Sequence, residues 1–543
     1  MRPPLPDEPP PAVPSVPLKA LSCRNQRVSL AALISSDSPA AAARLVLSDL
    51  RCGDAVVPAE TAAIRLVGTV PTPEAGLVCD PLLGTEQFPI DRSAAVYVTV
   101  PVPRGIPAGT YRGGVTLLVN EEQAATAPVK LEVANVDLPD LHDSTFFLGV
   151  WMNPATIARW HGVEVWSDEH FRLLEPYVHD LAEHGQKTVV APICYQPWGT
   201  QTRNPYPNLI RTTRRNGRYE FDFSLFDRYV RLHEKHGIDR AIHCYSLAQG
   251  PGAGDQSIIE YIDADTGQTV LLQTTVGDEQ YTLAWSAFLD AFAQHLRQRG
   301  WMDKTYLGLD EKPPEVMERL IAFAGEHAPG FKLALAGNTT DKLMRCIDDL
   351  CLHIGFNERG VAQSAPPERA AMGMAQLLDP DNVREPVSGR SGNMLTTYYV
   401  CCGPPFPNTF LFSPLVESRM LPWLAAQGGF DGFLRWSYSD WPDDPYQHPE
   451  YGRWPTGDTF FVYPGHDGPV SSLRWQQLLE GIYDYELAMI AAANTRTSEE
   501  MVDYEQAITL ACRNPDGRTK AVGDIEIARR LLIPIAEHQT DEG

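Results

Sequence analysis

The sequence predicts an α/β protein in which a (β/α)8 barrel follows an N-terminal β-sandwich. After Pro139, eight short apolar runs alternate with amphipathic stretches, whereas the region before it has strand-like runs and no long helix. Alternating strands and helices indicate a parallel sheet, and eight repeats indicate a closed barrel. The fourth run ends in two adjacent carboxylates, Asp310 and Glu311, at a position where such barrels carry their catalytic groups.

Residues 18–140 are predicted to form the sandwich. Their alternating runs are RVSLAALIS, ARLVLSDLRC, AAIRLVGTV, AAVYVTVPVP, GTYRGGVTLLVN and APVKLEVANVDLP. Strands without intervening helices indicate two packed antiparallel sheets. Gly113 and Gly114 indicate a bulge or a close approach of another segment. We expect this domain to pack against the catalytic domain, and sugar binding is the alternative role.

The barrel is predicted to occupy residues 141–498. Its strands are FFLGVW (146–151), KTVVAPI (187–193), RAIHCYSL (240–247), TYLGLDE (305–311), KLALAGN (332–338), LCLHIGFN (350–357), MLTTYYV (394–400) and GFLRWSYS (432–439). Several intervening helices are followed by the Gly typical of a helix end. An open doubly wound sheet is the structural alternative, but it would need a phosphate-binding glycine loop, and no GxGxxG or Walker sequence follows an early strand.

The two ends of the chain have a different character. Residues 1–17, MRPPLPDEPPPAVPSVP, are predicted to be a disordered Pro-rich arm, because they lack the apolar core of a secretory signal. The run SLRWQQLLEGIYDYELAMIAAA predicts a long helix that closes the barrel, and residues 499–543 predict a C-terminal helical extension.

Composition limits the function. The 543 residues carry a formal net charge of −24, which disfavours nucleic acid as a partner. No apolar stretch approaches the roughly 20 residues that span a bilayer, so a membrane is not expected. The ten cysteines lie mostly in apolar runs, which is typical of reduced core cysteines in a cytoplasmic protein. An oligomeric state is not indicated.

Cys401 and Cys402 are adjacent at a predicted strand end. Two packing thiols are the favoured interpretation. A metal site is a weaker one, because no CxxC or HExxH accompanies the pair. We therefore expect neither a metal nor a cofactor.

Polar and aromatic residues gather at or just past the strand ends, where they face the barrel mouth. They are Trp151, Asn153, Gln196, Trp198, Tyr245, Asp310, Glu311, Asn338, Asn357, Tyr398, Tyr399, Trp436, Tyr438, Asp440 and Trp441. Amides and carboxylates bind sugar hydroxyls, and aromatic rings stack on sugar C–H faces. Four other Asp-Glu pairs occur, and none ends an apolar run. The pattern predicts a carbohydrate site with Asp310 and Glu311 as its catalytic residues.

The adjacency of Asp310 and Glu311 constrains the mechanism. Neighbouring residues of a strand point to opposite sides, so both can reach one site only where the strand frays into a loop. A conventional retaining glycosidase places two carboxyls about 5 Å apart, commonly on different strands. A better fit has Glu311 as general acid and Asp310 orienting a nucleophile that belongs to the substrate. A protein nucleophile, Asp440, is the alternative.

These residues resemble glycoside hydrolase family 123 and its related C-terminal domain of unknown function. The resemblance rests on the strand-ending Asp310-Glu311, on GFLRWSYSDW, on GDTFFVYPGHDGPVSSLRWQQLLEGIYDYE and on the sandwich segment IPAGTYRGGVTL, which together span most of the chain. The segment GDTFFVYPGHDGPVSSLRWQQLLEGIYDYE is the most specific of these features.

The resemblance implies exo-acting release of β-linked N-acetylgalactosamine, or a related N-acetylhexosamine, with retention through an oxazolinium intermediate. It implies that Asp310 stabilises the acetamido group and that Glu311 is the acid/base. The sequence departs from the family at Lys312, where Pro is usual, so the leaving-group side of this loop is expected to differ. A non-catalytic sugar-binding barrel, a glycosidase of other specificity and a protein-binding scaffold are the alternatives.

Overall fold

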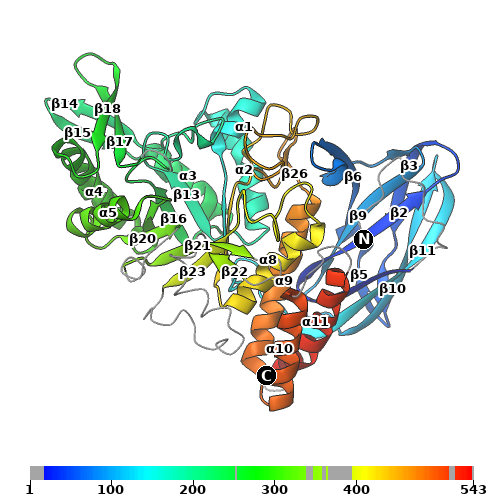
Figure 1. The fold of residues 1–543 in the computed structure, drawn as a ribbon. Coiled ribbons are helices and arrows are strands. Elements are labelled where there is room, and N and C mark those ends of the chain that lie inside the picture. The colour runs from blue at the N-terminus through cyan, green and yellow to red at the C-terminus, as the bar shows by residue number, and fades with distance from the viewer. Residues whose placement is uncertain are drawn as a thin grey trace.

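The computed structural model describes residues 17–250, 254–337, 346–356, 362–364, 394–512 and 520–540. Figure 1 shows the sandwich on one side of the molecule, the barrel in its centre and the C-terminal helices below them. Nearly all of the predicted N-terminal arm lies outside the described residues.

Two sheets form the sandwich. Its strands are β1 (Leu18–Arg24), β2 (Gln26–Ser35), β3 (Ala40–Leu47), β4 (Leu50–Cys52), β5 (Ala55–Val57), β6 (Ala63–Thr72), β7 (Gly76–Leu83), β8 (Phe88–Ile90), β9 (Ser93–Val102), β10 (Gly109–Val119) and β11 (Glu122–Asp137). One sheet has the order β1-β11-β10-β3-β8, with β4 and β5 beside β10, and the other has the order β2-β9-β6-β7. Val96, Val98 and Val100 alternate along β9 and lie in the core between the sheets, as expected for strands with one buried face.

Gly113 marks a close approach rather than a bulge. A Cβ at this position would lie 2.7 Å from the carbonyl oxygen of Asp49, so only glycine fits. The pairing of β10 with β11 is irregular farther along, where Leu117 and Leu118 face Ala125 and Gln123 and Ala124 of β11 is the extra residue.

Eight parallel strands form the barrel, and all eight were predicted. They are β12 (Phe147–Trp151), β13 (Thr188–Pro192), β16 (Ala241–Tyr245), β19 (Thr305–Leu309), β20 (Lys332–Ala336), β21 (Asp349–Phe356), β23 (Leu395–Tyr399) and β24 (Gly432–Trp436). Their order is β12-β24-β23-β21-β20-β19-β16-β13, with β22 (Ala362–Ser364) beside β21. The ends β12 and β13 meet at a single bridge, Leu148 to Gln186. The Gln186 amide extends this contact by binding the backbone N–H and carbonyl of Val150 at 2.8 and 3.0 Å.

Helices surround the barrel and cover its junction with the sandwich. They are α1 (Pro154–His161), α2 (Asp168–Ala182), α3 (Ser224–Lys235), α4 (Glu279–Arg299), α5 (Pro314–His327), α8 (Leu415–Gly428), α9 (Leu473–Asn494), α10 (Ser498–Cys512) and α11 (Lys520–Ala536). Short 3₁₀ turns are η1 (Ala59–Thr61), η2 (Gly199–Gln201), η3 (Met302–Lys304) and η5 (Glu537–Thr540), and a small hairpin pairs β25 (Tyr463–Pro464) with β26 (Pro469–Val470). The predicted long helix is α9, and the C-terminal extension forms α10 and α11.

A four-stranded sheet beside the barrel was not predicted. It consists of β14 (Arg211–Arg215), β15 (Arg218–Asp222), β17 (Gln256–Asp263) and β18 (Thr269–Thr275) and projects at the upper left of Figure 1. Its strands are half-exposed, and β14 has no apolar residue, although β17 and β18 contain the short apolar runs SIIEYI and TVLL, which the strand prediction omits. The turn Asn216-Gly217, with φ of 49° and 78°, is nevertheless a strong hairpin signal.

A buried ion pair joins the sandwich to the barrel domain. Arg474 at the start of α9 binds Asp80 of β7 at 3.1 Å, and both side chains are 1% exposed. Arg474 also donates to the carbonyl oxygens of Thr409 and Gly457 at 2.5 and 3.0 Å. One guanidinium thus connects the sandwich, helix α9 and two loops of the barrel.

We predict that Asp80→Asn lowers the free energy of unfolding by about 3–5 kcal/mol, because it leaves a buried guanidinium without its counter-charge. Urea denaturation of the full chain measures this. Glu121→Gln is the matched control, since its partner Arg44 forms an exposed pair and such pairs contribute little. Equal stability of Asp80→Asn and the wild type would contradict the role of this pair.

Candidate active site

Asp310 and Glu311 lie just beyond the end of β19, in the loop that leads to α5. Because the strand has already ended, alternation no longer forces the two carboxylates to opposite sides. Asp310 is 9% exposed, whereas Glu311 is exposed. One carboxylate is therefore desolvated and the other can be reached from solvent.

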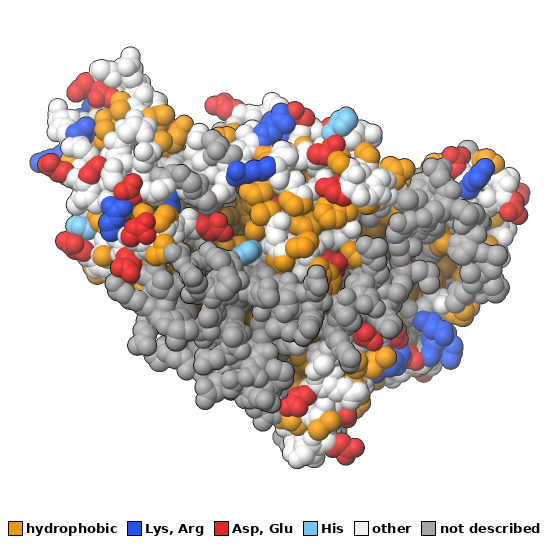
Figure 2. All heavy atoms as spheres, viewed as in Figure 1, with side chains coloured by type: hydrophobic (Ala, Val, Ile, Leu, Met, Phe, Trp, Pro, Cys, Tyr) orange, Lys and Arg blue, Asp and Glu red, His pale blue; other side chains and the backbone are white. Residues whose placement is uncertain are grey.

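An aromatic cluster fills the barrel at this level, and we call it the mouth cluster. It consists of Trp151, Val190, Trp198, Tyr206, Tyr245, Ala336, Cys351, Tyr399 and Leu434, with Cys401 and Trp436 packed against it. The rings of Trp151 and Trp198 lie 4.7 Å apart, and Tyr245 lies 4.8 and 5.2 Å from them. Figure 2 shows hydrophobic side chains together with acidic ones near the centre of this face of the molecule.

Gly308 allows the cluster to approach Asp310. A Cβ at this position would lie 2.8 Å from the ring of Tyr245, a distance that real Cβ atoms do not tolerate. The glycine two residues before Asp310 therefore lets Tyr245 pack directly against β19. The catalytic loop and the aromatic cluster are in this way one packed unit.

Burial raises the pKa of Asp310 to about 7, and the neighbouring charge of Glu311 acts in the same direction. The backbone N–H of Glu311, the ammonium of Lys312 and the indole of Trp198 oppose this rise. The carboxyl of Asp310 therefore titrates near neutral pH, as is common for catalytic groups.

Lys312 holds the neighbouring loop. Its ammonium donates to the carbonyl oxygens of Gly250 and Gly254 at 3.0 and 3.1 Å, and to that of Gln249. Three carbonyls satisfy its three donors. Where the resembled family usually has Pro, this chain has a cation that fixes the loop after β16 to the catalytic loop.

Glu311 is held from across the barrel. The Tyr399 hydroxyl, at the end of β23, donates to Glu311 Oε1 at 2.5 Å. Gly337, with φ of 136°, makes room for this side chain, since its Cβ would lie 3.0 Å from Glu311 Cγ. His353 packs against Tyr399, with the ring centres 5.0 Å apart. The second carboxylate thus has a fixed donor while it stays open to solvent.

Trp151, Tyr399 and Trp436 are the predicted binding residues that the structure places in or against the mouth cluster, and Tyr399 also contacts Glu311. The Trp436 indole also meets Trp454 edge to face at 5.2 Å. Its buried Nε1 has no hydrogen-bond partner among the described residues. A buried donor of this kind suits a ligand hydroxyl.

Asp440 is buried next to α1. It accepts hydrogen bonds from Asn153 Nδ2 at 3.0 Å and Thr156 Oγ1 at 3.1 Å, and burial raises its pKa to about 7. Both hydrogen bonds end on Oδ1 and tie Asp440 to the segment after β12, whereas its buried Oδ2 has no hydrogen-bond partner among the described residues. No hydrogen bond or ion pair joins it to Asp310 or Glu311 among the described residues.

Tyr398, Tyr438 and Trp441 were expected to bind sugar at the barrel mouth, and the structure corrects this expectation. Each of the three side chains is fully buried and lies outside the mouth cluster. The Tyr398 hydroxyl donates to Leu421 of α8 at 2.6 Å, since alternation along β23 turns it away from the barrel interior. Tyr438 donates to Asp180 at 2.6 Å and Trp441 to Val462 at 2.6 Å. Strand β24 already ends at Trp436, so its alternation cannot be extended to Tyr438.

Asn338 and Asn357, the remaining predicted binding residues, lie outside the described residues. Among mouth residues, sequence reasoning missed Tyr206 and His353. Tyr206 lies in the loop between β13 and β14 rather than at a strand end, so no periodic signal marks it. His353 is an interior position of a strand.

Two cavities that are not lined by Asp310 or Glu311 contain carboxylates that already have partners. The larger, of about 410 Å³, contains Asp180, which accepts from Tyr438 and Trp475. It also contains Glu183, which pairs with Arg27.

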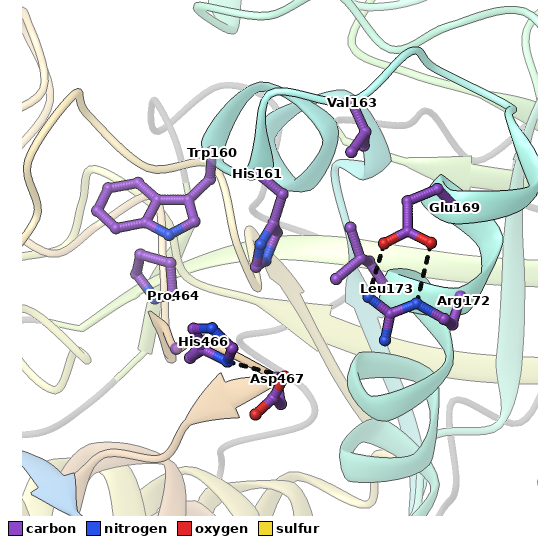
Figure 3. A pocket seen from close by; sticks show the side chains of 10 residues that line it. Trp160, His161, Val163, Glu169, Arg172, Leu173, Pro464, His466 and Asp467 are labelled. Carbon is purple, nitrogen blue, oxygen red and sulfur yellow. Dashed lines mark hydrogen bonds and ion pairs between the residues drawn. The ribbon is translucent and has the colours of Figure 1, made fainter.

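The other cavity, of about 370 Å³, lies between α1, α2 and the β25–β26 hairpin (Figure 3). Its Glu169 is paired with Arg172 at 2.7 Å and its Asp467 with His466 at 2.8 Å. No group of three or more potential metal ligands occurs in the described part of the chain, and no helix there is long and apolar enough to cross a membrane.

The segment GDTFFVYPGHDGPVSSLRWQQLLEGIYDYE (457–486), which we call the C-terminal motif, carries charged residues with a structural role. Asp458 binds Arg435 at 2.7 Å, and both side chains are almost completely buried. Asp484 accepts from Arg419 at 2.6 Å and from the Trp423 indole at 3.0 Å. These residues fix β24, α8 and α9 around the barrel and lie away from the catalytic loop.

Asp310→Asn tests the buried carboxyl. Because the folded pKa of about 7 exceeds the unfolded value of about 3.9, the folded state binds this proton more tightly. Stability is therefore lost as the pH rises through that window. The variant removes this loss, so its free energy of unfolding relative to the wild type should rise by about 1–3 kcal/mol between about pH 5 and about pH 8.

Urea denaturation at the two pH values measures this difference. Asp303→Asn, at an exposed position of η3, is the control and should show no such change. A pH-independent difference between Asp310→Asn and the wild type would mean that Asp310 ionises in the ordinary range.

Comparison with known proteins identifies the family. The model of "Glycoside hydrolase 123, catalytic domain" matches residues 151–491. A family 123 glycoside hydrolase from Clostridium perfringens has a similar structure, with a TM-score of 0.80 at 21% identity, over 96% of this chain and 94% of that one. A family 39 glycoside hydrolase from Bacteroides cellulosilyticus WH2 has a TM-score of 0.35 at 12% identity, over 77% of each chain.

No curated protein sequence matches the chain. The family model nevertheless covers more than half of the residues, and its range contains the catalytic loop, the mouth cluster and all of the barrel except the first residues of β12. The protein is a glycoside hydrolase that belongs to glycoside hydrolase family 123.

Proposed function

We propose that this hydrolase releases terminal β-linked N-acetylgalactosamine, or a related N-acetylhexosamine, with retention of configuration and with the substrate's acetamido group as nucleophile. The observation that carries this proposal is the placement of Asp310 and Glu311 on one loop, with Asp310 buried and Glu311 open to solvent. Asp440 is the alternative protein nucleophile; its Oδ1 is bound by Asn153 and Thr156, and it has no hydrogen bond to Asp310 or Glu311 among the described residues.

Glu311 has the surroundings of a general acid and base. It is exposed and hydrogen-bonded by Tyr399, so it can reach the glycosidic oxygen at the open side of the site. In the first step it protonates that oxygen as the bond breaks. In the second step it takes a proton from the water that attacks the anomeric carbon.

Asp310 has the surroundings of a stabiliser. The acetamido oxygen attacks the anomeric carbon and forms a bicyclic oxazolinium ion with a positive charge. An ionised Asp310 can accept a hydrogen bond from the acetamido N–H and stabilise that charge, and burial strengthens the interaction. Two attacks on the anomeric carbon, by acetamido oxygen and then by water, retain the configuration.

The mouth cluster supplies the apolar wall. Trp151 and Trp198 are nearly fully buried in this cluster, whereas Trp436 packs at its edge and is partly exposed, so Trp436 is the ring best placed to stack on a sugar C–H face. The Clostridium perfringens structure is described in terms of glycolipid glycan hydrolysis, which is consistent with a glycan end as the substrate here. A non-catalytic sugar-binding barrel would keep the wall but would not need a carboxylate that titrates near neutral pH.

Glu311→Gln should lower the hydrolysis of substrates with poor leaving groups by about 10²–10⁴-fold, while much of the rate on activated aryl glycosides is kept. Asp310→Asn should instead slow both kinds of substrate, because Asp310 acts on the sugar side. Steady-state rates on paired aryl and alkyl N-acetylhexosaminides measure both effects. Equal losses on both substrates for Glu311→Gln would contradict the acid assignment.

Progressive fluorination of the N-acetyl group should slow turnover steeply, because fluorine withdraws electron density from the attacking oxygen. The same aryl glycoside with a 2-hydroxyl in place of the acetamido group should hardly react. Turnover that is insensitive to fluorination, or a fluorosugar trapped covalently on Asp440, would restore a conventional two-carboxylate mechanism. Failure to hydrolyse any N-acetylhexosaminide would leave the alternative of a glycosidase of different sugar specificity.

A further inference from the structure

We propose that Cys401 and Cys402 form an oxidation-sensitive dithiol at the rim of the active site, and that its conversion to a disulfide by a hydroperoxide stops hydrolysis. The Cys401 Sγ lies 3.8 Å from Cys402 Sγ and 3.8 Å from His353 Nε2. The sequence favoured two thiols that merely pack at a strand end. The structure instead places one of them against the mouth cluster and the other at the surface.

Cys401 has the environment of a reactive thiol. Hydrogen bonds from Cys402 and His353 lower the pKa of its thiol, although burial opposes this. The thiolate is the form that attacks a peroxide. Five other cysteines contrast with it, because burial raises their pKa and keeps them as unreactive thiols. They are Cys23, Cys194, Cys244, Cys351 and Cys512.

The second thiol completes the site. Cys402 is exposed, so a small oxidant reaches the pair from solvent. The thiolate of Cys401 attacks one peroxide oxygen, which gives a sulfenic acid and releases hydroxide, or alkoxide from an organic peroxide. The Cys402 thiol then displaces the sulfenic oxygen as water. The two sulfurs lose two electrons and the peroxide gains them, and the released hydroxide or alkoxide is neutralised by the proton that Cys401 gave up when it ionised.

The position of the pair links oxidation to the catalytic loop. Cys401 lies two residues after Tyr399, whose hydroxyl holds Glu311. His353 contacts Cys401 with Nε2, packs on Tyr399 and binds the Gly403 carbonyl at 3.2 Å. A disulfide requires the sulfurs to close from 3.8 Å to about 2.05 Å, which moves Cys401 Sγ and disturbs its contact with His353. This movement changes how His353 packs on Tyr399, and with it the position of the hydroxyl that holds Glu311.

A disulfide between neighbouring residues is also easily reversed. Adjacent Cα atoms are about 3.8 Å apart, closer than the roughly 4.4–6.8 Å of most disulfides. Strained disulfides have the higher reduction potentials typical of regulatory pairs. The chemistry therefore suits a switch more than a structural bond.

Mass spectrometry of the full chain tests the modification without reference to activity. After treatment with hydrogen peroxide and alkylation, the wild-type peptide with both cysteines should be about 2 Da lighter than its reduced form, carry no alkyl group, and revert with dithiothreitol. In Cys402→Ser, Cys401 should instead gain one oxygen that a sulfenic-acid reagent captures. His353→Gln should slow alkylation of Cys401 at mildly acidic pH by about tenfold.

The effect on hydrolysis rests on the proposed function and has its own measurement. Peroxide should lower wild-type turnover of an aryl N-acetylhexosaminide by about tenfold or more, with recovery in dithiothreitol. Cys346→Ser changes another exposed cysteine and should respond as the wild type does.

Two results would overturn the proposal: complete alkylation of both thiols after peroxide, or a disulfide that leaves turnover unchanged. If the untreated enzyme hydrolyses no N-acetylhexosaminide, the proposed substrate is wrong. The mass measurement needs no substrate, so complete alkylation of both thiols after peroxide still overturns the proposal.

Discussion

The desolvation of Asp310 is the constraint on which the candidate active site depends. A carboxylate that is 9% exposed and next to a second carboxylate is costly to ionise, and its pKa rises to about 7. Other interactions must therefore stabilise the fold that keeps this carboxyl buried. They are the packing of the aromatic rings in the mouth cluster, the close approach of Tyr245 to Gly308 and the binding of Lys312 to three carbonyls. A substrate that brings an amide N–H to Asp310 stabilises the ionised form and offsets part of the cost.

The C-terminal motif supports this arrangement from outside. Arg435, Asp458, Arg474 and Asp484 are buried and paired with one another or with neighbouring segments. Arg435 alone binds Asp458, the carbonyl of Val400 at the end of β23 and the hydroxyl of Thr409. Breaking such a pair leaves an uncompensated buried charge. The motif therefore determines where the ends of β23 and β24 lie, and with them Tyr399 and Trp436.

Much of this architecture could be predicted from the sequence. The eight strands and α9 have strong periodicity, and Asp310-Glu311 ends a buried strand. The predictions that failed concern side chains near the end of a strand. The strand predicted over 432–439 runs past Trp436 to Tyr438, whereas β24 ends at Trp436 and the Tyr438 hydroxyl binds Asp180 of α2. Tyr398 was placed at the mouth because of its position in sequence, but its side chain follows the alternation of β23 and meets α8.

Residues that loops bring to the site could not be predicted from the sequence, for a different reason. Tyr206 reaches the mouth from a loop, and the half-exposed strand β14 (RTTRR) has no apolar residue. The role of Cys401 depends on a neighbour 48 residues earlier, His353. Such contacts are set by tertiary packing and have no local signal. Lys312 shows the same limit, because its three carbonyl partners lie on the loop after another strand.

The most direct test of this account is a crystal structure of the protein with a stable thiazoline mimic of the oxazolinium ion. We expect the bicyclic ring on the mouth cluster beside Trp151, Trp198 and Trp436, its ring nitrogen within hydrogen-bond distance of Asp310, and Glu311 on the leaving-group side of the anomeric carbon. A ligand whose ring nitrogen faces Asp440, or one bound outside the barrel mouth, would contradict the assignment of Asp310 and Glu311.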